Sequence, residues 1–173
     1  KKDDLKLDWF VPFDRDLFIM ADPGDSQFVI RGGGVEPNTV SMVLTTEFEI
    51  ASGGTPPVST GRTILFPFSA GEFSGVKEFY TDSDNSANAA NSLTETQDRY
   101  ISGSITGMAV SQNFNLGLFR TNKDRRTVWV YKYLWDGNEV LQSAWGKWQF
   151  QDVVEYFFFS NSVVYFLGRD TDG

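Results

Sequence analysis

Apolar and polar residues alternate along several stretches of this chain, and the alternation predicts β-strands. Between residues 41 and 50, one set of alternate positions is apolar or Thr, namely Met42, Leu44, Thr46, Phe48 and Ile50. The other set includes Glu47 and Glu49. Successive side chains of a strand point to opposite faces, so this stretch predicts a strand with one buried face.

Further strands are predicted where apolar runs are bounded by turn residues. Residues 16–21 and 26–31 are joined by Asp-Pro-Gly-Asp, which predicts a hairpin because Pro and Gly favour a tight turn. Residues 136–139, Asp-Gly-Asn-Glu, predict a second hairpin turn. The other expected strands are residues 63–68, 76–80, 105–110, 116–120, 127–135, 140–150, 153–159 and 163–167.

The expected strand at residues 127–135 has bulky side chains on both faces. One face collects aromatic residues, at Trp129, Tyr131, Tyr133 and Trp135. The opposite face collects aliphatic residues, at Val128, Val130 and Leu134. We therefore expect both faces of this strand to be covered by other parts of the protein.

Two polar stretches predict loops. Residues 52–61 are rich in Gly, Pro, Ser and Thr, which is typical of a loop. Residues 81–96 are polar and rich in Ser, Asn and Ala, which predicts a long polar loop.

The strand pattern also suggests an internal repeat. Residues 105–122 run strand, polar turn, strand, and residues 153–170 repeat this layout after about 48 residues. Another pair of strands lies between them, and four antiparallel strands per repeat are typical of a β-propeller blade. We predict an all-β, antiparallel fold of propeller-like blades, with a plain meander without true repeats as the alternative. Because two units do not close a propeller, we expect an open arc or a piece of one larger propeller-like domain.

This repeat suggests a division of the chain. Residues 1–104 are expected to form an N-terminal β segment that includes the polar loop near residues 81–96. Residues 105–173 are expected to form the blade-like repeats.

The amino-acid composition excludes several classes of function. The 173 residues include neither His nor Cys, which excludes imidazole and thiolate catalysis and His or Cys metal ligands. No apolar run approaches the roughly 18 residues of a membrane helix, so no membrane span is expected. The net charge of −8 disfavours tight DNA binding, which needs clustered cations. The basic cluster Lys123, Arg125 and Arg126 lies in a predicted turn.

Several residues are candidates for function, each with a plainer structural interpretation. Glu47 and Glu49 point the same way along their strand, roughly 6–7 Å apart, within the range of a glycosidase carboxylate pair. A solvated strand face is the favoured interpretation.

Trp145 and Trp148 are suited to stack on a sugar ring, although a role as core or subunit-interface aromatic residues is the favoured interpretation. The basic cluster is suited to contact DNA or carboxylates of a neighbouring subunit, although a solvated hairpin tip is favoured.

A calcium loop is a further candidate. Its oxygen ligands would come from Asp82, Asp84, Ser86, Asn88 and Glu95. The sixth position of an EF-hand loop starting at Asp84 is Ala89, where that loop needs Gly, and no flanking helix is predicted. A polar loop is favoured, so we expect no metal and no other cofactor.

Ordered sequence elements are similar to a known family. Residues 128–150 contain an aromatic strand with Tyr-Lys-Tyr-Leu, an acidic turn, and then Gln-Ser-x-Trp-x-x-Trp. Further elements lie in the N-terminal part, at residues 16–19, 26–30, 37–40 and 45–48. Together, over residues 14–167, they resemble the tail tubular protein B, or nozzle, family of T7-like short-tailed bacteriophages. Residues 53–60 and 82–91 match no family pattern, so partner contacts made there are not carried over.

The resemblance implies a structural virion component of the phage tail. Family members are much larger than this chain, have propeller-like β domains, and form a ring of six copies below the portal and its adaptor. The ring is the conduit through which genomic DNA leaves, and it carries the tail fibres. We therefore expect a non-enzymatic wall of this conduit, with transient passage of DNA and no tight binding. The alternative is a phage domain that degrades or binds glycans.

Overall fold

Nearly all of the described chain is β-structure. The computed structural model describes residues 6–13, 16–22, 27–32, 40–46, 55–82, 87–97, 99–136 and 139–170. In this part of the chain the strands pair antiparallel, and the helical element is one 3-10 turn, Glu95–Gln97. The predicted all-β antiparallel fold is confirmed. Two compact units are formed, Lys1–Ala70 with Gly75–Gln97, and Gly71–Ser74 with Asp98–Gly173.

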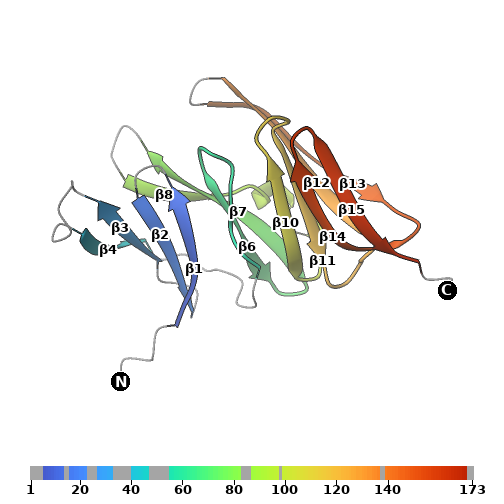
Figure 1. The fold of residues 1–173 in the computed structure, drawn as a ribbon, viewed down its shortest axis with the longest axis horizontal. Coiled ribbons are helices and arrows are strands. Elements are labelled where there is room, and N and C mark those ends of the chain that lie inside the picture. The colour runs from blue at the N-terminus through green and yellow to red at the C-terminus, as the bar shows by residue number, and fades with distance from the viewer. Residues whose placement is uncertain are drawn as a thin grey trace. The chain divides into compact units, whose positions relative to one another are not determined.

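The first unit opens with a four-stranded sheet. Strands β1 (Lys6–Phe13), β2 (Asp16–Asp22), β3 (Gln27–Gly32) and β4 (Val40–Thr46) follow one another in chain order (Figure 1). The predicted hairpin is β2–β3, and the alternating stretch at residues 41–50 coincides with β4 as far as it is described. Strand β1 was not predicted.

The second sheet of this unit also follows chain order. It contains β5 (Val58–Ser59), β6 (Ile64–Ala70), β7 (Phe73–Asp82) and β8 (Ala87–Ser92). The first two residues of β7 belong to the second unit, where they pair with β9 (Ile101–Ser102). Strand β5 lies within the stretch predicted as a loop at residues 52–61.

The prediction of a long polar loop at residues 81–96 is wrong. Strand β8 and the 3-10 turn Glu95–Gln97 lie there, and β8 pairs with β7 from Lys77↔Ser92 to Asp82↔Ala87. Polar composition does not prevent a strand when a neighbouring strand offers a complete hydrogen-bonding ladder. Ala90, opposite Phe79, also packs against the core of the unit.

Aromatic and aliphatic side chains join the two sheets of the first unit. The buried cluster draws on β1, β2, β6 and β7 and consists of Val11, Phe18, Met20, Ile64, Phe66 and Phe79. The Phe79 ring lies 4.2 Å from the Phe18 ring and 5.7 Å from the Phe13 ring, measured between centroids. Full burial of a side chain of this size stabilises a protein by about 1.5–3 kcal/mol, so this cluster holds the sheets face to face.

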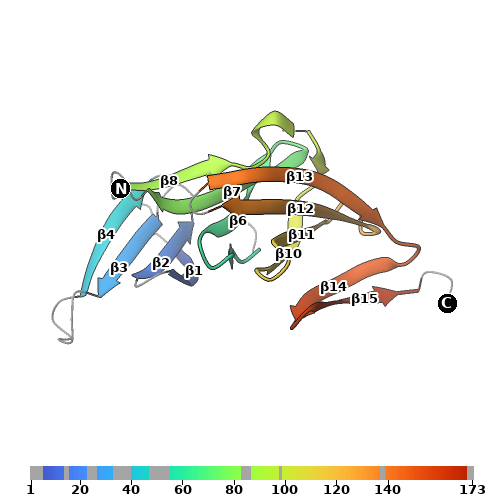
Figure 2. The ribbon, with the colours of Figure 1, turned by 90° about the horizontal axis from the view of Figure 1, so that it is seen from above.

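The second unit also joins two β-elements through a buried cluster, a four-stranded sheet and a two-stranded hairpin. Strands β10 (Ile105–Ser111), β11 (Leu116–Thr121), β12 (Thr127–Asp136) and β13 (Glu139–Gln149) form a four-stranded sheet in chain order. Strands β14 (Val153–Ser160) and β15 (Val163–Arg169) form a separate hairpin (Figure 2). All six strands coincide with predicted strands. A buried cluster joins sheet and hairpin, at Leu118, Val128, Val130, Val154 and Phe157.

Strand β12 is covered on both faces over most of its length. Trp129, Tyr131 and Tyr133 are buried on one face, as are Val128 and Val130 on the other. The prediction that both faces are covered is wrong at Leu134, whose side chain is 48% exposed. Val128 and Val130 of the same aliphatic face belong to the buried cluster shared with the hairpin, whereas Leu134 is not a member of it.

Consecutive four-stranded meanders, each made of strands adjacent in sequence, are compatible with propeller-like blades. The division at residues 104 and 105 stays a prediction.

Candidate functional site: the basic turn and its acidic partner

The basic residues Lys123, Arg125 and Arg126 lie in the turn between β11 and β12. Asp124 organises this turn, since its carboxylate accepts hydrogen bonds from the Arg126 N–H at 3.2 Å and from the Thr127 hydroxyl at 2.7 Å. Such local bonds from Asp to the following backbone are typical of turns. The backbone carbonyl of Arg126 also accepts from the Phe150 N–H at 2.9 Å.

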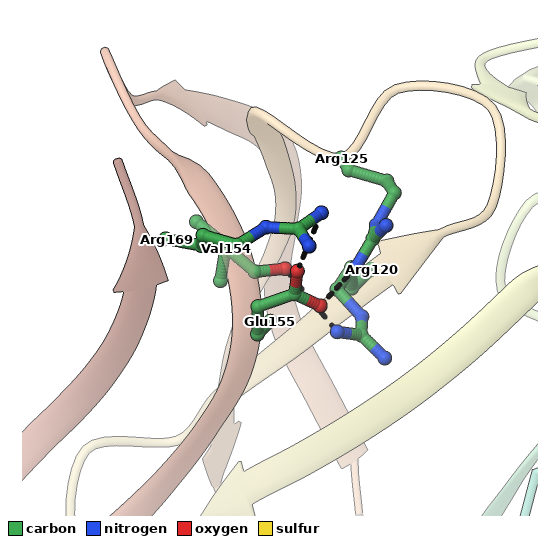
Figure 3. A network of polar contacts seen from close by, with 5 residues as sticks. All are labelled: Arg120, Arg125, Val154, Glu155 and Arg169. Carbon is green, nitrogen blue, oxygen red and sulfur yellow. Dashed lines mark hydrogen bonds and ion pairs between the residues drawn. The ribbon is translucent and has the colours of Figure 1, made fainter. Parts of the chain in front are cut away.

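The turn contacts the β14–β15 hairpin through Glu155. The Glu155 carboxylate pairs with the guanidinium of Arg125 and, at 3.3 Å, with that of Arg169 on β15. Figure 3 shows this carboxylate between the two guanidinium groups. One cation of the predicted cluster is therefore bound within the second unit.

A backbone connection lies beside this ion pair. Arg120 on β11 donates a hydrogen bond from Nη1 to the carbonyl of Val154 at 3.2 Å, and the Val154 N–H donates to the carbonyl of Arg125 at 2.8 Å. Burial lowers the pKa of Arg120, the charge of Arg125 lowers it further, and Glu155 opposes both effects. Arg120 stays charged despite this shift, because an arginine pKa starts far above neutrality.

The arrangement orients the hairpin and leaves an excess of positive charge. Two guanidinium groups, of Arg125 and Arg169, pair with the Glu155 carboxylate, and their side chains are 41% and 66% exposed. The guanidinium of Arg120 bonds to the adjacent Val154 carbonyl. Exposed ion pairs contribute about 0–1 kcal/mol each, so the network positions the hairpin more than it stabilises it. The side chains of Lys123 and Arg126 are exposed to solvent.

The two tryptophans lie on β13 in different surroundings. Trp145 is half-buried, with its ring centroid 4.9 Å from that of Tyr131, 5.3 Å from that of Phe119 and 6.5 Å from that of Tyr100. Trp148 is 39% exposed and meets Phe166 edge-on at 6.2 Å. Trp145 is thus an aromatic packing residue, whereas Trp148 presents part of its ring to solvent.

The carboxylate candidates are mostly outside the described residues. Glu47, Glu49, Asp84 and Ser86 lie there. Asp82 ends β7, Asn88 lies in β8, and Glu95 begins the exposed 3-10 turn. Among the residues that the structure describes, no three Asp or Glu side chains gather as a metal site would require. Nor does this part of the chain contain a helix long and apolar enough to cross a membrane.

Sequence reasoning missed Arg120, Glu155 and Arg169 as members of one network. A signal was present, because Glu155 is the one charged residue in the otherwise apolar or aromatic stretch 153–159. A lone carboxylate in such a strand requires a cationic partner once it is partly buried. The partner itself was not predictable, since Arg125 lies 30 positions away.

Comparison with known proteins assigns the family. The model of the bacteriophage nozzle protein family matches residues 2–173. Tail tubular protein gp12 of Escherichia phage T7 is 26% identical over 151 residues, which cover 86% of this chain and 19% of that protein. The chain therefore spans about a fifth of the length of this relative. It belongs to the bacteriophage nozzle protein family, which confirms the resemblance drawn from its sequence and makes it part of a structural component of the phage tail.

Proposed function

We propose that this chain forms part of the wall of the tail nozzle, the conduit through which the genome leaves the phage particle. Six copies of the full-length protein form the ring, which contacts an adaptor ring on one side and carries the tail fibres. The observation that carries the proposal is the family match over residues 2–173, which spans both compact units.

The packing of both units supports a wall. Each unit joins antiparallel strands through a buried aromatic and aliphatic cluster. Close-packed interiors have low compressibility, so such units keep their shape under load. The function of the chain is then structural: its rigid sheets enclose a channel, and the turns that connect the strands contact partner proteins.

Charge supports passage of DNA without tight binding. The net charge is −8, and Arg125 of the basic turn is already paired with Glu155. A surface of negative charge repels phosphates and lowers the affinity for DNA. Lys123 of the same turn is exposed, and we assign it to a contact with carboxylates of a neighbouring subunit.

The test uses the full-length protein. Mass photometry is expected to find rings near six copies, and addition of the adaptor protein should produce a larger complex. A protein that stays monomeric at every concentration and binds no tail protein would contradict the proposal.

Filter binding to duplex DNA at about 50 mM salt should give weak, salt-sensitive retention, whereas tight binding would contradict the passage model.

We further propose that the chain has no catalytic site of its own. The absence of His and Cys from the sequence supports this. So does the sequence around Glu47 and Glu49, in which no other residues suggest a sugar-binding site. Polysaccharide cleavage by the purified protein that is lost in the Glu47→Gln, Glu49→Gln double variant would establish the enzymatic alternative.

The partial exposure of Trp148 favours one other function, glycan binding without catalysis. A glycan array tests it with the native chain, Trp148→Ala and the control Phe114→Ala, which removes another exposed ring. Binding that only Trp148→Ala abolishes would support glycan recognition. No binding by the native chain removes this alternative.

A further inference from the structure

An exposed apolar surface lies at the end of the β12–β13 hairpin. The pairing of β11 with β12 ends at Leu116↔Lys132, whereas β12 and β13 remain paired as far as Asp136↔Glu139. This end of the hairpin therefore extends beyond β11 (Figure 1). We call its residues 134–136 and 139–142 the arm. Large apolar side chains of the arm are 39% to 60% exposed, at Leu134, Val140 and Leu141.

A β-bulge displays one of these side chains. Leu134 pairs with Gln142 and Trp135 pairs with Val140, so Leu141 between them has no partner in the register. A bulge of this kind turns a side chain out of the regular alternation and interrupts the ladder. Because a two-stranded hairpin is at best marginally stable without packing, the arm gains stability when a partner covers its apolar side chains.

The β14–β15 hairpin carries a second exposed apolar surface. Phe157 and Phe166 pair across this hairpin and pack against the four-stranded sheet. Adjacent residues of a strand point to opposite faces, so the residues on either side of them point away from that sheet. We call this side of the hairpin the outer apolar face. Its side chains are 39% to 61% exposed and belong to Tyr156, Phe158, Val163, Tyr165 and Leu167.

Strand pairing makes the outer apolar face continuous. Tyr156 pairs with Leu167 and Phe158 pairs with Tyr165, so the side chains form cross-strand rows. The rings of Phe158 and Tyr165 stack with centroids 5.2 Å apart. A contiguous apolar surface of this kind marks an interaction site, whereas single exposed apolar residues do not.

The two surfaces match in chemistry. None of the eight exposed side chains that form them is charged, so they offer nothing to the phosphates of a nucleic acid. The arm provides branched aliphatic side chains, and the outer apolar face provides rows of aromatic rings. Contacts of this composition are typical of the buried centre of an interface between proteins, where charged residues are depleted and aromatic residues are enriched.

The two surfaces of one copy do not cover each other. The arm belongs to the four-stranded sheet, and the inner face of the β14–β15 hairpin packs on that same sheet. The outer apolar face points to the opposite side of the hairpin, away from the sheet that carries the arm. A copy that donates its arm and accepts another therefore needs two neighbours, and such a head-to-tail contact generates a ring when the rotation closes.

We propose that the arm of one copy docks on the outer apolar face of the next copy and that this contact joins neighbouring subunits of the nozzle ring. Leu134, Val140 and Leu141 of the donor pack on the aromatic rows of the acceptor. The inference rests on the proposed nozzle function, and it identifies the surfaces that hold the ring together.

Charged substitutions in the full-length protein test the two surfaces separately. Leu141→Asp alters the arm and Tyr156→Asp alters the outer apolar face, while Leu7→Asp on β1, at a 42% exposed position of the first unit, is the matched control. Mass photometry measures the fraction of protein in rings. We expect each of the first two variants to raise the dissociation constant of the contact by at least about tenfold, because an aspartate is then placed in an apolar contact. The control should form rings as the native protein does.

A mixture of the two defective variants tests the head-to-tail arrangement. The Leu141→Asp copy keeps an intact outer apolar face, and the Tyr156→Asp copy keeps an intact arm. One productive contact per pair is then possible, so the mixture should form particles of twice the monomer mass and no rings. Neither variant alone should form these pairs.

The outcomes separate this inference from the proposed function. Native protein that forms no ring contradicts the nozzle function and, with it, the inference. Native rings together with unchanged rings of Leu141→Asp or Tyr156→Asp overturn the inference alone. A mixture that forms no pairs also overturns it.

Photo-crosslinking gives a readout that does not depend on a disruptive charge. Benzoylphenylalanine replaces Leu141 in nitrogen-15-labelled full-length protein, which is mixed with unlabelled native protein before irradiation. Mass spectrometry should find position 141 of a labelled copy joined to residues 156–167 of an unlabelled copy. Crosslinks confined to labelled peptides, or to any other segment of the protein, would show that the arm docks elsewhere.

Discussion

The guanidinium of Arg120 on β11 donates a hydrogen bond at 3.2 Å to the backbone carbonyl of Val154 on β14. The Val154 N–H is also used, since it donates to the carbonyl of Arg125 at 2.8 Å. Val154 is buried, where unpaired backbone groups are costly. The two backbone groups of Val154 thus hold the hairpin to β11 and to the turn that follows it, and the Glu155 ion pairs lie next to these bonds.

Glu155→Gln should weaken the second unit modestly, because it removes the carboxylate from Arg125 and Arg169. The pairs are partly exposed, so we expect a loss of about 0.5–1 kcal/mol in the free energy of unfolding, and less at high salt. Urea unfolding followed by tryptophan fluorescence at low and high salt measures this. Asp152→Asn, at an exposed site just before β14, is the control. A loss that does not respond to salt would argue against an electrostatic role.

Phe79→Ala should destabilise the first unit strongly. The side chain is buried and contacts the rings of Phe13 and Phe18, so its removal leaves a cavity between the two sheets. The expected loss is about 3–5 kcal/mol in the free energy of unfolding by urea. Phe10→Ala, at a 55% exposed position on β1, should cost less than about 1 kcal/mol. Equal losses would show that Phe79 is not a core residue.

Gly75→Ala and Gly146→Ala should have opposite consequences although both glycines lie in strands. A methyl group at Gly75 would overlap the Phe68 ring and lie 2.6 Å from the Thr94 hydroxyl, whereas one at Gly146 meets no atom within 4 Å. We expect a loss of about 1–3 kcal/mol for Gly75→Ala. Gly146→Ala should be neutral or stabilising by up to about 1 kcal/mol. Thermal unfolding of both variants measures the contrast, and a tolerated Gly75→Ala would contradict the close packing.

Glu78→Gln should change how stability depends on pH. Burial raises the pKa of Glu78 above its ordinary value of 4.5, and a hydrogen bond with the Thr63 side chain lowers it by less. The folded protein therefore holds this proton more tightly than the unfolded chain does. The resulting stabilisation is complete below the unfolded-state pKa of 4.5 and is lost as pH rises through the folded-state pKa.

A neutral glutamine side chain in place of Glu78 avoids this loss. Urea unfolding should therefore find Glu78→Gln more stable than the native chain at about pH 7, with a smaller or no gain at about pH 4. Glu95→Gln, at an exposed site of the same unit, provides the control. A gain that is the same at both pH values would contradict the raised pKa.

Most strands were predictable because their pattern is local. Strands β10 to β15 of the second unit coincide with apolar runs between turn residues, and Asp136 of β12 pairs with Glu139 of β13, as the predicted hairpin requires. Strand β8 was missed because its polar, small residues carry no period-two signal, and its conformation depends on the ladder offered by β7. The exposure of Leu134 was missed because alternation shows that it shares a face with Val128 and Val130 but not how far the packing over that face extends.

The sequence by itself determined the all-β class, the family resemblance and the absence of His and Cys chemistry, since these depend on residue types and their local order. Only the tertiary structure decided which charges meet: it paired Arg125 with Glu155 and packed Trp145 against Phe119 and Tyr131. It also left Tyr156 and Leu167 of the β14–β15 hairpin exposed. The physical reason is that alternation specifies which side chains share a face of a strand, whereas the packing of sheets specifies what each face contacts.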